Sequence, residues 1–301
     1  MPEPGALAPG AAVALVGLGR MGVPMALRLL AAGYDVRGYD VSEGARRAFE
    51  DASGRDATET VVEAVAGADV LLLMLPDSTS VHDVLAAGVV EVLPRGGIVL
   101  DMGSSDPVRT RAHAEEVERH GHSLVDAPVS GGVVGAESGT LTIMVGGDPD
   151  AVARCLPLLE CLGSSIVPAG GVGAGHALKA LNNLLSATHL LASVEVLRAG
   201  QRFGLDPETM VAAINTSSGR SFSTEHKLPR FVLTGTYDTG FSLGLMNKDV
   251  QTALGVTGAT HTPAHLAQAV AALWDEAAAE LGPAADHTEI ARWVEGLPEP
   301  D

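Results

Sequence analysis

The sequence predicts two domains: an α/β domain with a doubly wound, mostly parallel sheet, followed by an all-helical domain. Three observations predict this fold class. Short apolar runs alternate with helical patterns through the first half, which is typical of a parallel sheet covered by helices. From about Ala174 onward, long helical patterns follow with almost no strand signal. A length of 301 residues also exceeds what one ordinary core holds, and we expect the boundary near Gly170–Gly173.

The apolar runs predict the strands of the first domain. Val70–Leu75 is apolar throughout, as a strand buried on both faces should be. The expected strands, in chain order, are Ala12–Val16, Asp35–Tyr39, Val70–Leu75, Ile98–Leu100, Leu124–Val125, Thr140–Val145 and Ser165–Val167.

The helices are predicted from the residues at their ends. Asp106 and Asp148 each precede a proline, the pattern of an N-cap followed by Pro at the first helical position. Gly121 and Gly163 stand where glycines end helices. In the second half, Ala174 to about Phe203 predicts one helix of about 30 residues. Further helices are expected from Asp206-Pro207, over Leu243–Gly258 and over Pro263–Leu281.

Composition excludes several classes of protein. Hydrophobic residues make up 46% of the chain, so it can bury a core. A formal net charge of −18 argues against partners such as nucleic acid and anionic membranes. We see no apolar run of about 20 residues that would span a bilayer, and no signal peptide. Cys155 and Cys161 are expected to be reduced thiols in a cytoplasmic protein, and no metal site is expected.

A glycine-rich segment follows the first predicted strand and opens a helix. Its residues match G-x-G-x-x-G and are Gly17, Leu18, Gly19, Arg20, Met21 and Gly22. In this position the pattern predicts a Rossmann-type, dinucleotide-binding loop, with the pyrophosphate at the helix N-terminus. The alternative is a structural turn with a surface aspartate nearby.

Asp40 ends the second predicted strand, 18 residues after Gly22. A carboxylate there accepts hydrogen bonds from ribose hydroxyls and repels a 2′-phosphate, which predicts NAD over NADP. Arg46 and Arg47 follow and leave the strictness of that preference open.

Two further loops should contact the cofactor, because ligands of such sheets lie at the carboxyl ends of the strands. Leu75 and Pro76 follow one strand, and Ser104 follows the next. Met102 and Gly103 precede Ser104, and we expect them to alter the wall beside the substrate.

Lysine is rare in this chain. Of its 19 basic residues only three are lysines, Lys179, Lys227 and Lys248. Lys179 and Asn183 are four residues apart and therefore share a helical face. An apolar setting would lower the pKa of Lys179 and suit it to proton transfer, with the carboxamide of Asn183 orienting the reacting oxygen. The leucines expected to form that setting are Leu178, Leu181 and Leu185.

Two of these lysines also have a structural interpretation, and the third a role in binding. Lys179 and Asn183 together can be an interdomain packing pair. Lys227 can be an ordinary surface lysine. Lys248 would supply positive charge for an anionic substrate in an acidic protein. Asp249 is either its partner or a helix residue facing water.

Four ordered segments give the chain a family resemblance over nearly its whole length. The sequence resembles the β-hydroxyacid dehydrogenases, the family of 3-hydroxyisobutyrate dehydrogenase and tartronate-semialdehyde reductase, which is related to 6-phosphogluconate dehydrogenase. The matching segments are Gly17–Gly22 with Asp40, Asp126–Val133 followed by Gly139–Thr142, Gly173–Asn183, and Lys248-Asp249.

The resemblance implies roles for particular residues. Lys179 would be the catalytic acid/base and Asn183 its substrate-orienting partner. Lys248 would lie beside substrate and nicotinamide. The substrate-binding residues implied are Ser130, Gly131, Gly132, Asn182 and Lys248. The local chemistry agrees, because a hydroxyl and unobstructed backbone N–H groups suit a carboxylate, although a flexible glycine-rich turn is the alternative.

The expected activity is hydride transfer between NAD and the C3 hydroxyl of a small 3-hydroxy acid such as 3-hydroxyisobutyrate. The alternatives are a reductase of an aldehyde acid (tartronate semialdehyde, succinic semialdehyde or sulfolactaldehyde), an oxidative decarboxylase, an imine reductase, and a non-catalytic NAD sensor. The resemblance also implies a long interdomain helix and a homodimer or homotetramer. The expected segments are a disordered tail (1–10), an NAD-binding domain (11–171), a helical substrate and oligomerisation domain (172–297), and a tail (298–301).

Overall fold

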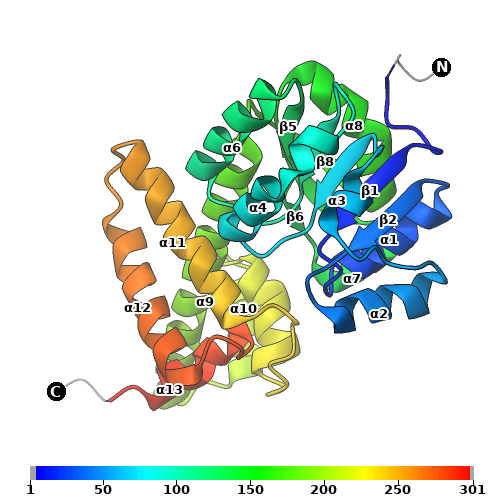
Figure 1. The fold of residues 1–301 in the computed structure, drawn as a ribbon. Helices are drawn as coiled ribbons and strands as arrows, with labels where there is room; N and C mark the ends of the chain where they lie inside the picture. The colour runs from blue at the N-terminus through cyan, green and yellow to red at the C-terminus, as the bar shows by residue number, and fades with distance from the viewer. Residues whose placement is uncertain (1–4, 299–301) are drawn as a thin grey trace. The chain divides into compact units, whose positions relative to one another are not determined.

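The computed structural model describes residues 5–298. Its contacts divide the chain into two compact units, one ending at Lys179 and the other beginning at Ala180. Helix α9 (Ala174–Phe203) is continuous across this division, as the helical pattern over these 30 residues predicted. Figure 1 shows the strands in the first part of the chain and the long helices in the second, so the predicted fold class is confirmed.

An eight-stranded sheet forms the middle of the α/β unit. Its order is β2-β1-β3-β4-β5-β7-β6, and β8 pairs with β7. Strands β1 to β5 are parallel, β7 is antiparallel to β5 and β6, and β8 is parallel to β7. The strands are β1 (Ala12–Val16), β2 (Asp35–Tyr39), β3 (Val70–Leu73), β4 (Ile98–Asp101), β5 (Ser123–Asp126), β6 (Val129–Ser130), β7 (Leu141–Gly146) and β8 (Gly163–Gly170).

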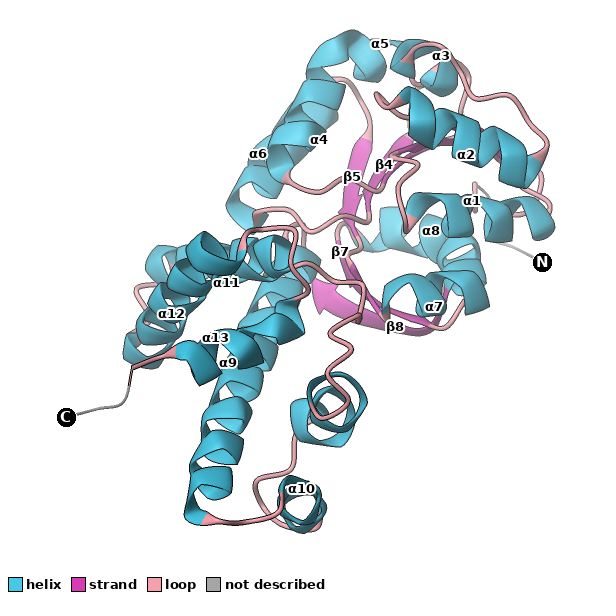
Figure 2. Ribbon diagram, turned by 90° about the horizontal axis from the view of Figure 1, so that it is seen from below, coloured by secondary structure: helices cyan, strands magenta, loops and turns pink. Residues whose placement is uncertain are grey.

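Two apolar cores lie on the two faces of this sheet. Along β1, Val13 and Leu15 belong to one core, and Ala14 and Val16 to the other. This alternation follows from the two-residue period of a strand, and it explains why the parallel strands are apolar without interruption. Figure 2 shows α4 and α6 on one side of β4 and β5, and α1 and α8 on the other. The helices of this unit are α1 (Gly22–Ala31), α2 (Glu43–Ser53), α3 (Val61–Val65), α4 (Ser78–Val84), η1 (Leu85–Val89), α5 (Val90–Val92), α6 (Pro107–Arg119), α7 (Gly132–Ser138) and α8 (Pro149–Leu162).

The helix ends are mostly as predicted. Asp106 and Asp148 accept hydrogen bonds from the first turns of α6 and α8, with proline at the start of each helix. Gly121 follows α6 with a φ of 80°. Gly163 ends α8 as predicted, but its φ is −142°, so it leaves the helix in an extended conformation and begins β8 instead of adopting a left-handed one. A side chain there would overlap the carbonyl oxygen of Leu141 on the adjacent strand.

The expected disordered tail differs from the structure where residues are described. Leu7 is 2% exposed and belongs to the core that contains Leu15. Its N–H donates to the carbonyl of Arg154, and the Tyr34 hydroxyl donates to its own carbonyl. The proline- and glycine-rich composition hid this apolar anchor, and residues 1–4 lie outside the described part of the chain.

In the described residues 180–298 of the second unit, the regular elements are all helices. Trp274 is completely buried in its core, together with Leu228, Leu243 and Val250. Sequence periodicity missed η2, whose turns are wider than those of an α-helix. Among residues 5–298, none of the helices combines the length and apolar character that crossing a bilayer requires. The helices after α9 are α10 (Pro207–Asn215), η2 (Ser223–Val232), α11 (Leu243–Ala259), α12 (His265–Leu281), η3 (His287–Glu289) and α13 (Ile290–Gly296).

Candidate active site

The carboxyl ends of five parallel strands lie in one row across the α/β unit. The paired residues of this row are Tyr39, Val16, Leu73, Asp101 and Asp126. The loops that leave this row carry Asp40, the glycine-rich segment, Leu75 with Pro76, and Ser104. The structure therefore brings the predicted cofactor-binding residues of the α/β unit to one edge of the sheet, while Lys248, also predicted, lies on a helix of the second unit.

The glycine-rich loop has the shape that a dinucleotide requires. Side chains at Gly17 and Gly22 would overlap the carbonyl oxygens of Met74 and Gly17, so both positions need glycine for the protein's own packing. A side chain at Gly19 would meet no protein atom within 4 Å. That space is where the backbone must approach a pyrophosphate, at the N-terminus of α1. The loop thus fits NAD.

Asp40 lies at the end of β2 and supports the same loop. Its Oδ2 accepts a hydrogen bond from the Leu18 N–H at 2.8 Å, and its Oδ1 accepts one from the Ser42 N–H at 2.8 Å. Arg46 donates to the carbonyl of Asp40, and Arg47 pairs with Glu43. Both arginines are therefore engaged close to their own helix.

The loop after β4 differs from expectation in one respect. Met102 is completely buried in the core and lines no wall at the surface. Gly103 lets this loop pack against the loop after β3, because a side chain there would overlap the carbonyl oxygen of Leu75. Met102 and Gly103 therefore shape the packing below Ser104.

The loop that carries Ser130 follows β5 at the same edge of the sheet. Ser130 is half-buried at the end of β6. Gly131 and Gly132 have φ values of 134° and 63°, which other residues rarely adopt. This backbone leaves the loop open at Gly132, where a side chain would meet nothing within 4 Å.

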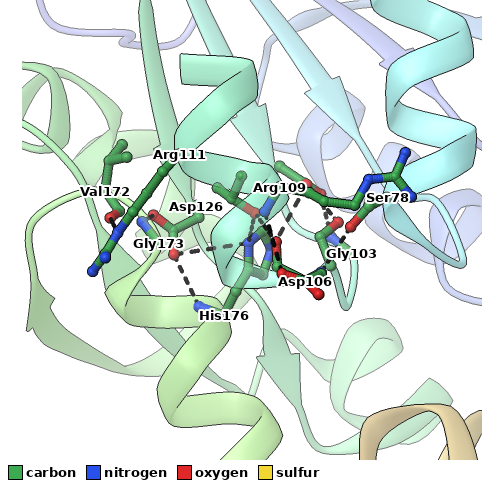
Figure 3. A network of polar contacts seen from close by, with 12 residues as sticks. Ser78, Gly103, Asp106, Arg109, Arg111, Asp126, Val172, Gly173 and His176 are labelled. Carbon is green, nitrogen blue, oxygen red and sulfur yellow. Dashed lines mark hydrogen bonds and ion pairs between the residues drawn. The ribbon is translucent and has the colours of Figure 1, made fainter. Parts of the chain in front are cut away.

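Helix α9 begins at this edge as well. The Asp126 carboxylate accepts hydrogen bonds from the N–H groups of Gly173 (2.7 Å) and His176 (2.9 Å) (Figure 3). Arg111 of α6 donates to the carbonyl of Val172. Sequence reasoning missed the role of Asp126; its position at the end of a strand, ahead of a glycine-rich helix start, was the available signal.

Lys179 is half-buried on the second turn of α9, but its surroundings are not those predicted. Leu178, Leu181 and Leu185 are 38%, 39% and 55% exposed. At about 100° per residue, Leu178, Leu181 and Leu185 lie about 100°, 160° and 120° around the helix from Lys179, so none shares its face. The expected apolar setting from these leucines was therefore wrong, while Asn183 does lie on the face that carries Lys179.

Hydrogen-bonded polar side chains connect α9 to α11 in the helical unit. Asn182 donates to Asn183 at 3.1 Å, and Asn183 donates to Asp249. Lys248 lies 3.0 Å from the other carboxylate oxygen of Asp249. Asp249 is 1% exposed, so it faces the interior instead of water and holds both neighbours.

Lys227 is not a surface lysine. It is 7% exposed, and its Nζ donates to Ser186 Oγ at 2.9 Å. Burial, reinforced by the charge of Lys227, lowers the pKa of His287 to about 4. His287 is therefore neutral near pH 7, with its Nδ1 within hydrogen-bonding distance of the Phe241 carbonyl.

A glycine-rich loop at the carboxyl edge of a parallel sheet, followed by a helical domain with buried polar side chains, defines a class of protein. That class is the dehydrogenases with an N-terminal dinucleotide-binding domain and a C-terminal helical domain. Residues 12–171 match the model of the NAD-binding domain of 6-phosphogluconate dehydrogenase. Residues 173–294 match the model described as NAD-binding of NADP-dependent 3-hydroxyisobutyrate dehydrogenase.

Individual relatives agree with these family models. The chain is 39% identical to 2-(hydroxymethyl)glutarate dehydrogenase of Eubacterium barkeri, over 80% of this chain and 81% of that one. It is 37% identical to the NAD-dependent L-serine dehydrogenase of Pseudomonas aeruginosa, over 79% and 82%. The solved 3-hydroxyisobutyrate dehydrogenase of Mycobacterium tuberculosis, with L-serine, has a TM-score of 0.89 and 31% identity, over 95% of this chain and all of that one. The chain belongs to the β-hydroxyacid dehydrogenase family, as its four segments predicted, and is an NAD-binding oxidoreductase.

Proposed function

We propose that this protein reversibly oxidises the C3 hydroxyl of a small 3-hydroxy acid, with Lys179 as the catalytic acid/base. NAD supplies the hydride acceptor at its nicotinamide ring. The observation that carries the proposal is the start of α9: Asp126 fixes the first turn of this helix at the edge of the sheet where the dinucleotide loop lies. Lys179 follows three residues after His176 on that helix.

The chain's residues have the following proposed roles in binding the cofactor. The loop Gly17–Gly22 holds the pyrophosphate, and Asp40 accepts hydrogen bonds from the adenosine ribose. Leu75, Pro76 and Ser104 border the dinucleotide. NAD is preferred over NADP because Asp40 is an anion where NADP carries its 2′-phosphate. The engagement of Arg46 and Arg47 near their own helix supports this preference.

The proposed substrate residues carry out binding and proton transfer. Lys179 takes the hydroxyl proton, and Asn183 with Asn182 orients the reacting oxygen. Ser130, Gly131 and Gly132 hold the carboxylate through a hydroxyl and open backbone donors, and Lys248 adds positive charge. The buried Asp249 fixes Lys248 and Asn183 in the helical unit, which supports their joint use.

Replacement of Lys179 tests this function. We expect Lys179→Ala to lower kcat by about 100- to 10,000-fold, the usual contribution of general acid–base catalysis, while NADH binding is unchanged. The assay follows NADH absorbance with a panel of hydroxy acids of three to five carbons, and fluorescence titration measures the Kd for NADH. A variant that keeps its turnover would remove Lys179 from the role. NADH binding by the wild-type protein without turnover on any acid would indicate a sensor.

The substrate class is proposed at the level that the relatives support. 3-Hydroxyisobutyrate, L-serine and 2-(hydroxymethyl)glutarate appear in the names of related enzymes, and each carries a primary alcohol near a carboxylate. Reduction of an aldehyde acid such as tartronate semialdehyde is the same chemistry in reverse. The panel should therefore include both hydroxy acids and their aldehyde acids.

We also propose which function each domain has, that copies of the chain form an oligomer, and in which compartment the protein acts. Residues 11–171 bind NAD, and residues 172–297 bind substrate and join copies of the chain into a homodimer or homotetramer. An apolar stripe along one side of α9 supports that assembly: its members, 37% or more exposed, are Leu178, Leu181, Leu185, Val196 and Phe203. Two free cysteines are in keeping with action in the cytoplasm.

A further inference from the structure

A buried polar cluster joins the sheet to the first turn of α9. Its members are Asp101 at the end of β4, Asp126 at the end of β5, Thr110 on α6 and His176 on α9, and each is at most 1% exposed. Burying two carboxyl groups and an imidazole costs free energy unless their polar atoms are satisfied. The proposed reaction uses none of these four side chains, so their arrangement calls for another role.

Thr110 fixes the ring of His176 to the start of α6. The hydroxyl oxygen of Thr110 lies 2.9 Å from the carbonyl oxygen of Asp106 and 2.8 Å from His176 Nδ1. The hydrogen bond between this hydroxyl and Nδ1 holds the imidazole in one orientation, because a hydroxyl can serve either as donor or as acceptor to the ring nitrogen.

The other side of the ring faces the cofactor loop. His176 Nε2 lies 3.7 Å from Asp101 Oδ2 and, among the described residues, has no hydrogen-bond partner. Asp101 itself accepts hydrogen bonds from the Gly103 N–H (3.0 Å) and the Ser105 hydroxyl (2.8 Å). These bonds shape the loop that carries Ser104. One imidazole therefore lies between the cofactor loop and the helix of Lys179.

We propose that His176 is a positioning residue that fixes the rotation of the first turn of α9, and with it the amine of Lys179. The backbone of His176 is held by Asp126 and its ring by Thr110, so the helix is fixed at two points. Lys179 is three residues further on and lies on the adjacent part of the same helical side. The inference rests on the proposed role of Lys179, and the experiment separates the two.

Three replacements of His176 test this role. An asparagine places an amide group, which can donate or accept, near the position of Nδ1, so His176→Asn should keep the bond to Thr110. Glutamine reaches toward the position of Nε2, and alanine keeps neither. We expect His176→Gln and His176→Ala to lose about 10- to 100-fold in kcat, the size of effect that a 1 Å misplacement produces. His176→Asn should stay near the wild-type kcat, and the Kd for NADH should change in none of them.

Thr110 provides a second test of the same bond. Thr110→Val removes the hydroxyl that bonds Nδ1 and should lower kcat as His176→Gln does. Thr110→Ser keeps the hydroxyl, so its kcat should stay near the wild-type value. Because valine is similar in size to threonine, this pair separates loss of the hydrogen bond from loss of packing.

His122 is the matched control for general destabilisation. It is a second buried histidine of this unit, 6% exposed, and its Nε2 lies 2.9 Å from the Val90 carbonyl. It precedes β5, at the end of the strand opposite Asp126. We expect His122→Ala to lower Tm about as much as His176→Ala does while leaving kcat unchanged.

The outcomes are distinguishable. If kcat falls as far in His176→Asn as in His176→Ala, His176 is only structural and the inference is overturned. The same holds if His122→Ala loses as much kcat as His176→Ala. If Lys179→Ala abolishes turnover while His176→Ala keeps its kcat, the proposed function stands and only the positioning role fails. If Lys179→Ala keeps its turnover, the proposed function itself fails.

Discussion

Two carboxylates of the α/β unit and one of the helical unit are held in different ways. In the α/β unit, Asp40 and Asp126 accept hydrogen bonds from backbone N–H groups, so the path of the chain places them. In the helical unit, Asp249 is held by the side chains of Lys248 and Asn183, which come from separate helices. The first arrangement should therefore fail when backbone shape changes, and the second when a side-chain charge is removed.

The largest effect should follow from a methyl group in the glycine-rich loop. The Cβ of Gly22→Ala would overlap the carbonyl oxygen of Gly17, which is backbone and has little freedom to move. We expect a loss of about 3 kcal/mol in the free energy of unfolding, together with loss of NADH binding. Denaturant unfolding and fluorescence titration measure the two quantities.

Gly19→Ala is the matched control in the same loop. Its Cβ meets no protein atom within 4 Å, so the unfolding free energy should stay at the wild-type value. NADH binding should still weaken, because the methyl group enters the space proposed for the pyrophosphate. Unchanged NADH affinity in Gly19→Ala would contradict the proposed course of the dinucleotide.

A smaller effect is expected from neutralising the buried carboxylate of the helical unit. Asp249→Asn keeps the shape of the side chain but removes the charge that faces Lys248 and Asn183. We expect about 2 kcal/mol of lost stability, as for a hydrogen bond to a charged group, and a similar loss in transition-state binding. The latter corresponds to about a 30-fold fall in kcat/KM for the acid.

Asp275→Asn is the control for this change. Asp275 on α12 also accepts two side-chain hydrogen bonds, from Asn247 (2.7 Å) and Gln251 (2.8 Å) on α11, but it is exposed. Its replacement should leave kcat/KM unchanged. Equal losses in both variants would mean that Asp249 only joins helices.

The smallest effect should be the pH dependence that His287 adds to stability. The pKa of His287 is about 4 in the folded protein, against 6.5 for an ordinary histidine. Between these values the unfolded chain binds a proton that the folded protein does not, so stability falls as pH falls. From pH 6.5 to about 5.5 the loss should be about 1 kcal/mol.

His287→Asn removes this titration while keeping an N–H near the position of Nδ1. The slope of unfolding free energy against pH should therefore be flatter in the variant over this interval. Denaturant unfolding at several pH values measures the difference between the two proteins, which cancels the contribution of carboxyl groups common to both. Parallel slopes would show that His287 titrates normally.

Much of the fold was predictable because its signals are local. The apolar run of β1, the aspartate-proline starts of α6 and α8, and the helical pattern over the 30 residues of α9 all lie within single elements. β6 is only two residues long, and η2 has a wider turn than the α-helical period, so neither gave a readable pattern. The burial of Leu7 depends on its bond to Arg154, 147 positions further along, which local composition does not reveal.

The candidate site, like the fold, was predictable only where its signal lies within one segment of the sequence. The glycine-rich loop has its own spacing, and the loop geometry fits that expectation. The partners of Asp249 and the network around His176 depend on residues brought together from separate elements, and spacing along the chain carries no trace of them. The leucines beside Lys179 show the opposite error: they are neighbours in sequence, but the helix directs them away from it.

The bond between Asp40 and the N–H of Leu18 limits how cofactor preference can be changed. The same carboxylate that we propose binds the ribose also anchors the bend preceding the first helix. An engineer who neutralised it to admit a phosphorylated sugar would leave a backbone donor unsatisfied and loosen that bend. Redesign would therefore need a substitute acceptor, such as a serine hydroxyl, together with the new positive charge.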